Sequence, residues 1–335
     1  MLRLSFILPC YNVAPYFGRC IESIEHQDIP QSEYEVICVD DCSKDNTVEV
    51  IKEYQKQYPN IRLICHTENK TAGGARNTAI EAAEGEYIWC VDPDDSIQSC
   101  VLGSILKKAE EQNLDILLFN LSYTDENGGN AERIFHNTQY DVYTGVDYTI
   151  THCAPRYLYN VASHTGCIYN RLFLDSNHIR YPEIRSSQDV AFIWHAILLS
   201  KRVSALKNVC YNVYRRPDST TGSKGELRAV SVVSTVLLYV DVINQYRGIS
   251  NNELIEENIL YDMRSTVNDD SRKVIRMSRY QQSLFYKEIG QHTDLINRYR
   301  FLMNRKTQVI LNYHLPYAVW QLIIWAYMLK NSIKK

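Results

Sequence analysis

The sequence predicts an α/β protein in which helices flank a mostly parallel β-sheet, with a helical region at the C-terminal end. Three observations lead to this prediction. Short apolar runs typical of buried strands alternate with helical patterns over the first 125 residues. Clusters of acidic and polar residues directly follow several of these runs. From residue 226 onward the pattern is helical, with faces rich in Tyr and Leu.

The first region supplies the strands and helices around the sheet. The expected strands are the apolar runs at residues 4–8, 36–39, 61–65, 87–91 and 116–121. The expected helices have apolar residues at helical spacing and cover residues 13–27, 47–58, 74–83 and 101–112. Gly85 is well placed to end the third helix. Because short buried strands alternate with helices, right-handed crossovers should join the strands in parallel.

The alternation is lost after the turn sequence DENGGN at residues 125–130. Residues 131–215 mix short strands with helices, of which 187–200 is the clearest helix, and a strand is expected at 211–214. This part of the chain shows no regular order of strands and helices, so its topology does not follow from its pattern.

Composition excludes several classes of protein. The 335 residues are 45% hydrophobic and 22% charged, which fits a folded protein with a full core. The net charge of −3 offers no sequence-wide basic surface, so nucleic acid is not an expected partner. The ten cysteines lie mostly in apolar runs, which favours buried free thiols. The N-terminal apolar run lacks a following cleavage site, so we interpret it as a strand of a cytosolic protein.

Three carboxylates, Asp92, Asp94 and Asp95, directly follow the apolar run at residues 87–91. Oxygen ligands of this kind suit Mg²⁺ or Mn²⁺, which is usually completed by substrate phosphates. Taken alone, such a short string is more often a solvated acidic turn.

Asp40 and Asp41 end another expected strand. Because the carboxyl ends of parallel strands face one crevice, these acids should lie near the first cluster. That much negative charge makes sense if one carboxylate accepts a hydrogen bond from a nucleobase while the other cluster binds a metal. Alternatively, Asp40 or Asp41 caps the helix that begins near Thr47, and for Asp45 we expect this capping role.

Four ordered segments together resemble family 2 glycosyltransferases, which are inverting enzymes with the Rossmann-like GT-A fold. The segments are SFILPCYN, VDDCSKDNT, GGARNTAIEAAEGEYIWCVDPDD and SSQDVAFIWHAILLSKRV. The resemblance spans residues 3 to about 220. It implies a GT-A domain over residues 1–222, with a nucleotide-sugar half at 1–125 and an acceptor half at 126–222. A helical region at 223–335 would follow.

The resemblance also implies site residues. Pro9 and Tyr11 would line the nucleobase pocket, and Asp41 would accept the base N–H, uracil being the usual base. The residues expected at the nucleotide are Pro9, Tyr11, Asp41, Arg76 and Asp94. The residues expected at the metal, Mn²⁺ or Mg²⁺, are Asp92, Asp94 and Asp95, which the sequence does not rank. The pair Gly73-Gly74 before the expected helix would let the backbone approach a ligand closely.

The catalytic base implied by the resemblance is Asp189, which would take the proton of the acceptor hydroxyl. In the family a Glu-Asp pair begins this helix, whereas here the pair is Gln188-Asp189. Asp189 near a helix N-terminus should tend to be ionised, and Gln188 removes a like charge beside it. A first-turn acid that merely stabilises its helix is the alternative.

Two further segments carry open interpretations. Residues 215–226 form a loop with Arg215, Arg216 and Lys224, which either closes over the diphosphate or is a plain surface loop. Residues 315–330 form an apolar helix too short to span a bilayer, with Trp320 among its aromatic residues. This helix either contacts the inner membrane leaflet, packs on its own core or forms a homodimer face.

The function implied is sugar transfer from a nucleotide-sugar, with UDP as the usual carrier, to a saccharide or lipid-linked saccharide in cell-surface polysaccharide synthesis. A nucleotide-sugar binding protein without catalysis is an alternative, favoured only by Gln188. A sugar-phosphate nucleotidyltransferase is a weaker one, because the Gly-rich basic loop of that class is missing after the first strand.

Overall fold

The computed structural model describes residues 2–124, 129–133, 141–152, 163–184, 188–214 and separate stretches between 239 and 323. The chain divides into two compact units. The first comprises Met1–Ile184 and Gln188–Arg216, and the second comprises Arg185–Ser187 and Pro217–Lys335. The domain boundary predicted at residue 222 lies outside the described residues.

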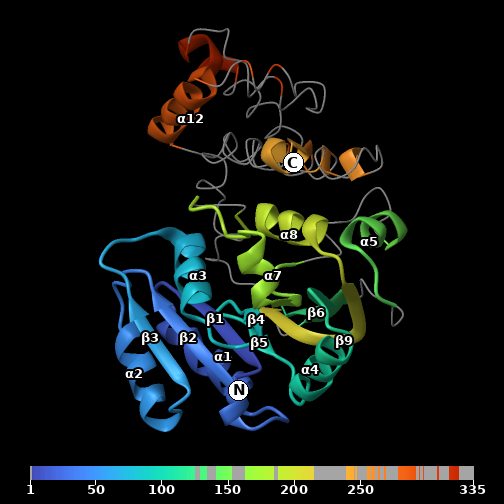
Figure 1. The fold of residues 1–335 in the computed structure, drawn as a ribbon. Coiled ribbons are helices and arrows are strands. Elements are labelled where there is room, and N and C mark those ends of the chain that lie inside the picture. Colours follow the sequence, from blue (N-terminus) through green and yellow to red (C-terminus); the bar gives the residue numbers. More distant parts are fainter. Residues whose placement is uncertain are drawn as a thin grey trace. The chain divides into compact units, whose positions relative to one another are not determined.

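The first unit is built on one nine-stranded sheet with the strand order β3-β2-β1-β4-β8-β6-β9-β5, in which β7 pairs with β6 (Figure 1). The strands are β1 Leu4–Cys10, β2 Tyr34–Asp40, β3 Ile61–Cys65, β4 Tyr87–Cys90, β5 Ser96–Ile97, β6 Ile116–Thr124, β7 Asn130–Arg133, β8 Cys167–Asn170 and β9 Val203–Tyr214. Strands β1 to β4 are mutually parallel, as predicted. Beyond them the sheet is mixed, because β8 lies antiparallel between β4 and β6.

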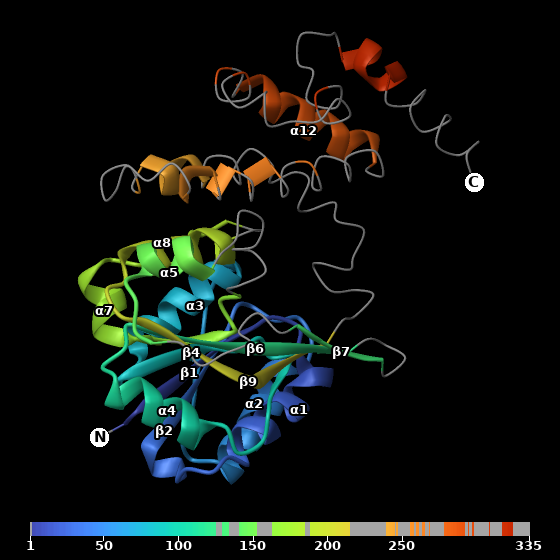
Figure 2. The same cartoon turned by 90° about the vertical axis from the view of Figure 1, so that its right-hand side faces the viewer.

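Helices cover both faces of the sheet (Figure 2). They are α1 Ala14–Glu25, α2 Thr47–Gln57, α3 Thr71–Ala82, α4 Leu102–Glu111, α5 Gly145–His152, α7 Arg171–Ser176 and α8 Gln188–Leu199, with a short 3-10 helix at Gln31–Glu33. α1, α2 and α4 lie on one face, and α3, α7 and α8 on the other. The GT-A type α/β arrangement predicted from the sequence is therefore present.

Strand β1 is buried on both faces of the sheet. Its alternate residues Leu4, Phe6 and Leu8 belong to the core under α1 and α4, where Phe6 stacks on Trp89 at 5.7 Å between ring centroids. Ile7 points to the other face and is fully buried as well. A strand buried on both faces reads as a continuous apolar run, which is how the sequence predicted it.

Two predictions about local structure were wrong. Helix α3 begins at Thr71 rather than at residue 74, so both glycines lie inside its first turn. A Cβ atom at Gly73 would come within 2.6 Å of the Pro182 carbonyl oxygen and 2.8 Å of Gln188 Oε1. Gly73 therefore allows close approach of another part of the chain, and the approach of a ligand to the Gly73-Gly74 pair stays a prediction. The strand predicted at 211–214 is the end of the longer β9, whose apolar run is interrupted by exposed Lys207 and Asn208.

The second unit contains α12, Arg279–Gln291, and a helical segment at 317–323. Trp320 is fully buried, with its ring 5.4 Å from that of Tyr286 and 5.9 Å from that of Tyr317. Val319 and Leu322 on the same segment are exposed. No helix in the described part of the chain has the length and apolar character needed to cross a membrane.

Candidate active site

The candidate site lies where three neighbouring parallel strands, β2, β1 and β4, reach their carboxyl ends. The turns after these strands are tied together, because the Asp41 N–H donates to the Cys10 carbonyl at 2.8 Å and the Val91 N–H donates to the Ile7 carbonyl at 3.0 Å. In sheets of this kind, ligands bind at this edge. The acids predicted from the sequence follow β2 and β4 here.

Asp41 is held rigidly at the end of β2. Its side chain is buried, and its Oδ1 accepts hydrogen bonds from His66 Nδ1 and from the Lys70 N–H, both at 2.8 Å. The other ring nitrogen of His66 lies 2.9 Å from Thr78 Oγ1 on α3. The Asp41 carboxylate at Nδ1 and the Thr78 hydroxyl at Nε2 together hold the His66 ring in a fixed orientation. Both side-chain bonds fall on Oδ1, so Oδ2 is the oxygen that can meet a ligand.

The two residues predicted on β1 differ in exposure. Pro9 is buried within the strand, opposite Val39 in the β1–β2 register. Tyr11 follows the strand and is 45% exposed, which leaves its ring accessible to a planar base. Asp45 accepts from the Thr47 N–H at 3.1 Å, so it satisfies the start of α2 as predicted, although Asn46 occupies the N-cap position.

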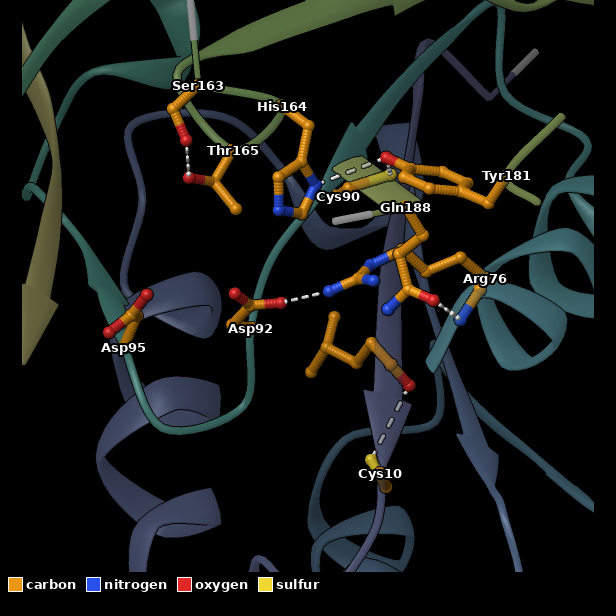
Figure 3. Close-up of polar contacts among 12 residues, drawn as sticks. Cys10, Arg76, Cys90, Asp92, Asp95, Ser163, His164, Thr165, Tyr181 and Gln188 are labelled. Carbon is orange, nitrogen blue, oxygen red and sulfur yellow. Dashed lines mark hydrogen bonds and ion pairs between the residues drawn. The ribbon is translucent and has the colours of Figure 1, made fainter. Parts of the chain in front are cut away.

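Arg76 on α3 forms an ion pair with Asp92 after β4 (Figure 3). Its Nη2 lies 2.6 Å from Asp92 Oδ1, and the guanidinium lies 5.2 Å from the centre of the Tyr181 ring. Burial lowers the pKa of Arg76, but the charge of Asp92, the groups of Tyr181 and Cys90 and the hydrogen bond to Asp92 together more than offset this and keep the guanidinium charged. The Arg76 Nε is buried and has no hydrogen-bond partner among the residues that the structure describes. A buried donor of this kind is suited to an acceptor that arrives with a ligand.

Asp95 has a different environment from Asp92. Its carboxylate is 5% exposed and accepts from the Tyr211 hydroxyl and from the Tyr214 N–H, both at 2.8 Å. Burial, reinforced by the charges of Asp94 and Asp92, raises the pKa of Asp95 well above its usual range. Figure 3 shows Asp92 directed toward Arg76 and Asp95 lying apart from this pair.

The residues present fit a metal that arrives together with a diphosphate. Within the described residues, no three His, Cys, Asp or Glu side chains gather as they would around a metal enclosed by protein. Asp94 lies half-buried between Asp92 and Asp95 in an acidic turn. Mg²⁺ and Mn²⁺ are commonly held by one or two carboxylates and completed by substrate phosphates, so an open acidic turn suits them.

The N-terminus of α8 brings Asp189 and Gln188 to the same region. Asp189 is half-buried in the first turn of α8. Gln188 is 9% exposed, and its Oε1 accepts from the Gly73 N–H in the first turn of α3 at 3.1 Å. The helix that carries the candidate base is therefore joined to the helix that carries Arg76.

Several residues at the site were not predicted from the sequence. His164 and Tyr181 are buried beside Arg76, and His164 Nδ1 lies 3.2 Å from the Tyr181 hydroxyl (Figure 3). Burial, followed by the charge of Arg76, lowers the pKa of His164. No motif marks these two positions, because each depends on contacts with distant parts of the chain. Asn77, which the family resemblance implies as a support of the donor pocket next to Arg76, makes two 2.8 Å hydrogen bonds with the backbone of Tyr181 and so positions it.

Residues 215–226, interpreted as a loop that closes over the diphosphate, lie outside the described residues. The apolar helix predicted at 315–330 is described only over 317–323. There, the burial of Trp320 removes one of the aromatic side chains expected at a membrane surface.

Comparisons with known proteins place the chain in a family. A family model described as "Glycosyl transferase family 2" matches residues 5–175. A poly(ribitol-phosphate) beta-glucosyltransferase of Bacillus spizizenii is 31% identical over 212 residues, which cover 63% of this chain and 32% of that protein. The poly(ribitol-phosphate) beta-N-acetylglucosaminyltransferase TarS of Staphylococcus aureus is 30% identical over 63% of this chain and 35% of its own length. The chain thus spans about a third of the length of these relatives.

Solved structures share the fold. The crystal structure of S. aureus TarS 1–349 superposes with a TM-score of 0.66 at 23% identity, covering 97% of this chain and 89% of that one. TarS 1–349 has also been solved with UDP and with UDP-GlcNAc. A mannosyltransferase of Pyrobaculum calidifontis, solved with GDP-Man and Mn²⁺, superposes with a TM-score of 0.55 at 17% identity over 96% of this chain and 87% of that one. The family match covers both acidic strand ends and the arginine of α3, and the chain belongs to glycosyl transferase family 2.

Proposed function

We propose that the chain transfers a sugar from a UDP-sugar to a saccharide acceptor, free or lipid-linked, during synthesis of a cell-surface polysaccharide. The observation that carries this proposal is a connected set of contacts. Gln188 beside Asp189 bonds the first turn of α3, and Arg76 on α3 pairs with Asp92 in the acidic turn. The proposed base, a buried cation and the proposed metal-binding turn are thereby linked by contacts. The relatives that act on poly(ribitol-phosphate) support a polymeric acceptor.

For donor binding, we assign each residue one contact. Asp41 Oδ2 accepts the N–H of uracil while Oδ1 stays bonded to His66. The exposed ring of Tyr11 covers the base. The unpaired Nε–H of Arg76 donates to an oxygen of the nucleotide. UDP bound to TarS supports uracil as the base.

For the metal, we assign Asp94 as the principal protein ligand, with Asp92 beside it. A bound Mn²⁺ or Mg²⁺ would offset the negative charge that develops on the departing diphosphate. The protein itself contributes the fixed acidic turn and the charge of Arg76. That charge counters the repulsion between Asp92 and a diphosphate.

For the transfer, we assign Asp189 as general base. The acceptor hydroxyl attacks the anomeric carbon from the face opposite the diphosphate, so a new C–O bond forms while the bond to the phosphate oxygen breaks. Asp189 takes the hydroxyl proton, and UDP leaves with the electron pair. One displacement inverts the configuration at the anomeric carbon.

The test combines donor choice with a matched variant. The protein is incubated with Mn²⁺, a panel of nucleotide-sugars and polyol-phosphate or saccharide acceptors, and nucleoside diphosphate release is measured. Asp147 provides the control, because it also lies in the first turn of a helix, α5. Asp189→Asn should abolish acceptor-dependent release and Asp147→Asn should not. UDP binding without acceptor-dependent release in the wild type would favour a non-catalytic binding protein instead.

We further propose that the protein works at the cytoplasmic face of the membrane, where a lipid-linked acceptor would be reached. The apolar segment around Val319 and Leu322 supports a surface contact, and a homodimer face is the other role for it. Flotation with anionic liposomes separates these roles, since protein that stays at the bottom as a dimer rules out the membrane contact.

A further inference from the structure

A buried tyrosine hydroxyl joins the acidic turn after β4 to strand β9. Tyr211 on β9 has no exposed surface. Its hydroxyl accepts from the Asp92 N–H at 3.0 Å and donates to Asp95 Oδ2 at 2.8 Å. The other oxygen of Asp95 accepts from the Tyr214 N–H at 2.8 Å, further along the same strand. One side chain of β9 thus contacts both ends of the Asp92–Asp95 turn.

Three further contacts support this junction. Within the turn, the Asp95 N–H donates to the Asp92 carbonyl at 2.9 Å. Arg19 of α1 lies 3.5 Å from the centre of the Tyr214 ring and donates to the Asp94 carbonyl. Strand β9 is itself paired with β6 on one side and with β5 on the other, where Tyr211 of β9 lies opposite Ile97 of β5. A turn anchored to a strand of the sheet holds its side chains more precisely than a free loop does.

We propose that Tyr211 and Asp95 are positioning residues that fix the acidic turn, so that Asp94 meets the metal and diphosphate in one orientation, and that Asp95 is not itself a metal ligand. This inference rests on the proposed function. Both oxygens of Asp95 accept hydrogen bonds from β9, and Asp95 is buried whereas Asp94 is half-buried. Partners that orient a ligand-bearing turn commonly affect metal affinity nearly as strongly as ligands do.

The first test compares two buried tyrosines that differ in location. Tyr87 is also fully buried, and its hydroxyl donates to the Ala109 carbonyl at 2.9 Å from the opposite end of β4. Tyr211→Phe and Tyr87→Phe each remove one buried hydroxyl, so both should lower the Tm by a few degrees. Only Tyr211→Phe should raise the Mn²⁺ concentration for half-maximal UDP binding, by about 10-fold. UDP binding is measured by calorimetry across a Mn²⁺ series.

The second test separates a positioning role from ligation and does not require Tyr211→Phe to fold. In Asp95→Asn the amide oxygen still accepts from the Tyr214 N–H and the amide nitrogen donates to the Tyr211 hydroxyl, so the anchor is retained. The Mn²⁺ dependence of UDP binding should change clearly less than in Asp94→Asn. Equal losses in the two Asn variants, or equal Mn²⁺ dependence in the two Phe variants, would overturn the inference alone. A wild type that binds no UDP at any Mn²⁺ concentration would overturn the proposed function and the inference with it.

Discussion

The ion pair between Arg76 and Asp92 should contribute strongly to stability, which Arg76→Met tests. The arginine side chain is 6% exposed and lies 2.6 Å from the carboxylate. At an effective dielectric constant of about 20, unit charges about 4 Å apart attract by about 4 kcal/mol. Removing one partner of a buried pair costs about 3–5 kcal/mol. Because the Asp92 side chain is 32% exposed, water screens it in the variant, and we expect a loss near 3 kcal/mol.

The assay is urea unfolding of the wild type, Arg76→Met, Asp92→Asn and the double variant. If the pair acts as a unit, the double variant should be about 2 kcal/mol more stable than the sum of the single losses predicts. Methionine keeps the apolar stem of the arginine, so the loss reports on charge rather than on a cavity.

A second ion pair supplies the control for binding. Arg62 lies 2.6 Å from the buried carboxylate of Glu35 and belongs to β3. Arg62→Met should also destabilise the protein but leave UDP affinity unchanged, whereas Arg76→Met should weaken UDP binding at every Mn²⁺ concentration. The reasoning is refuted if the losses from Arg76→Met and Asp92→Asn add to within about 0.5 kcal/mol, since independent sites behave in this way.

The remaining predictions concern α8 and His164. Asp189→Asn should lower kcat by about 100-fold to 10,000-fold with UDP affinity retained, as measured by steady-state kinetics and calorimetry. Gln188→Ala should lower both the unfolding free energy and kcat, because the Gly73 N–H loses its acceptor; an alanine variant as active as wild type would contradict this. The pKa of His164 is lowered by burial and then by Arg76, so the unfolded chain binds more protons than the folded chain below about pH 6.5. The free energy of unfolding should therefore decrease as the pH is lowered through this range. Urea midpoints across pH should show a smaller fall for His164→Asn, and equal slopes would count against burial of a neutral imidazole.

The strands on which the acids sit could be predicted because each is a nearly uninterrupted apolar run. β2, predicted at 36–39, is observed at Tyr34–Asp40, and β4, predicted at 87–91, at Tyr87–Cys90. The short strands could not be predicted in the same way. β8 has only the residues Cys167–Asn170, and its place between β4 and β6 comes from pairing with strands far away in the sequence. A run of that length carries no periodic signal of its own.

Site residues that follow from a local sequence pattern were predicted, whereas those that depend on contacts between distant parts of the sequence were not. Asp41 and Asp92 stand directly after strands, so the local pattern placed them at the sheet edge. Tyr211 reaches Asp95 across 116 residues of sequence, and no local pattern records such a contact. His66, which orients Asp41, lies 25 residues away and in no recognised motif. Tyr211 and His66, which position other residues through distant contacts, were therefore missed, whereas Asp41 and Asp92 could be named as candidates from the sequence.

The amide at Gln188 is compatible with catalysis, although the family resemblance places an acid there. What the position requires, on the structural evidence, is a buried acceptor for the Gly73 N–H, and Gln188 Oε1 supplies it at 3.1 Å. A glutamate would supply the same acceptor but would also put a second negative charge, in a position only 9% exposed, beside Asp189. That charge would repel the carboxylate of Asp189. Since the helix contact survives the exchange of acid for amide, the presence of glutamine does not by itself indicate a protein that only binds nucleotide-sugars.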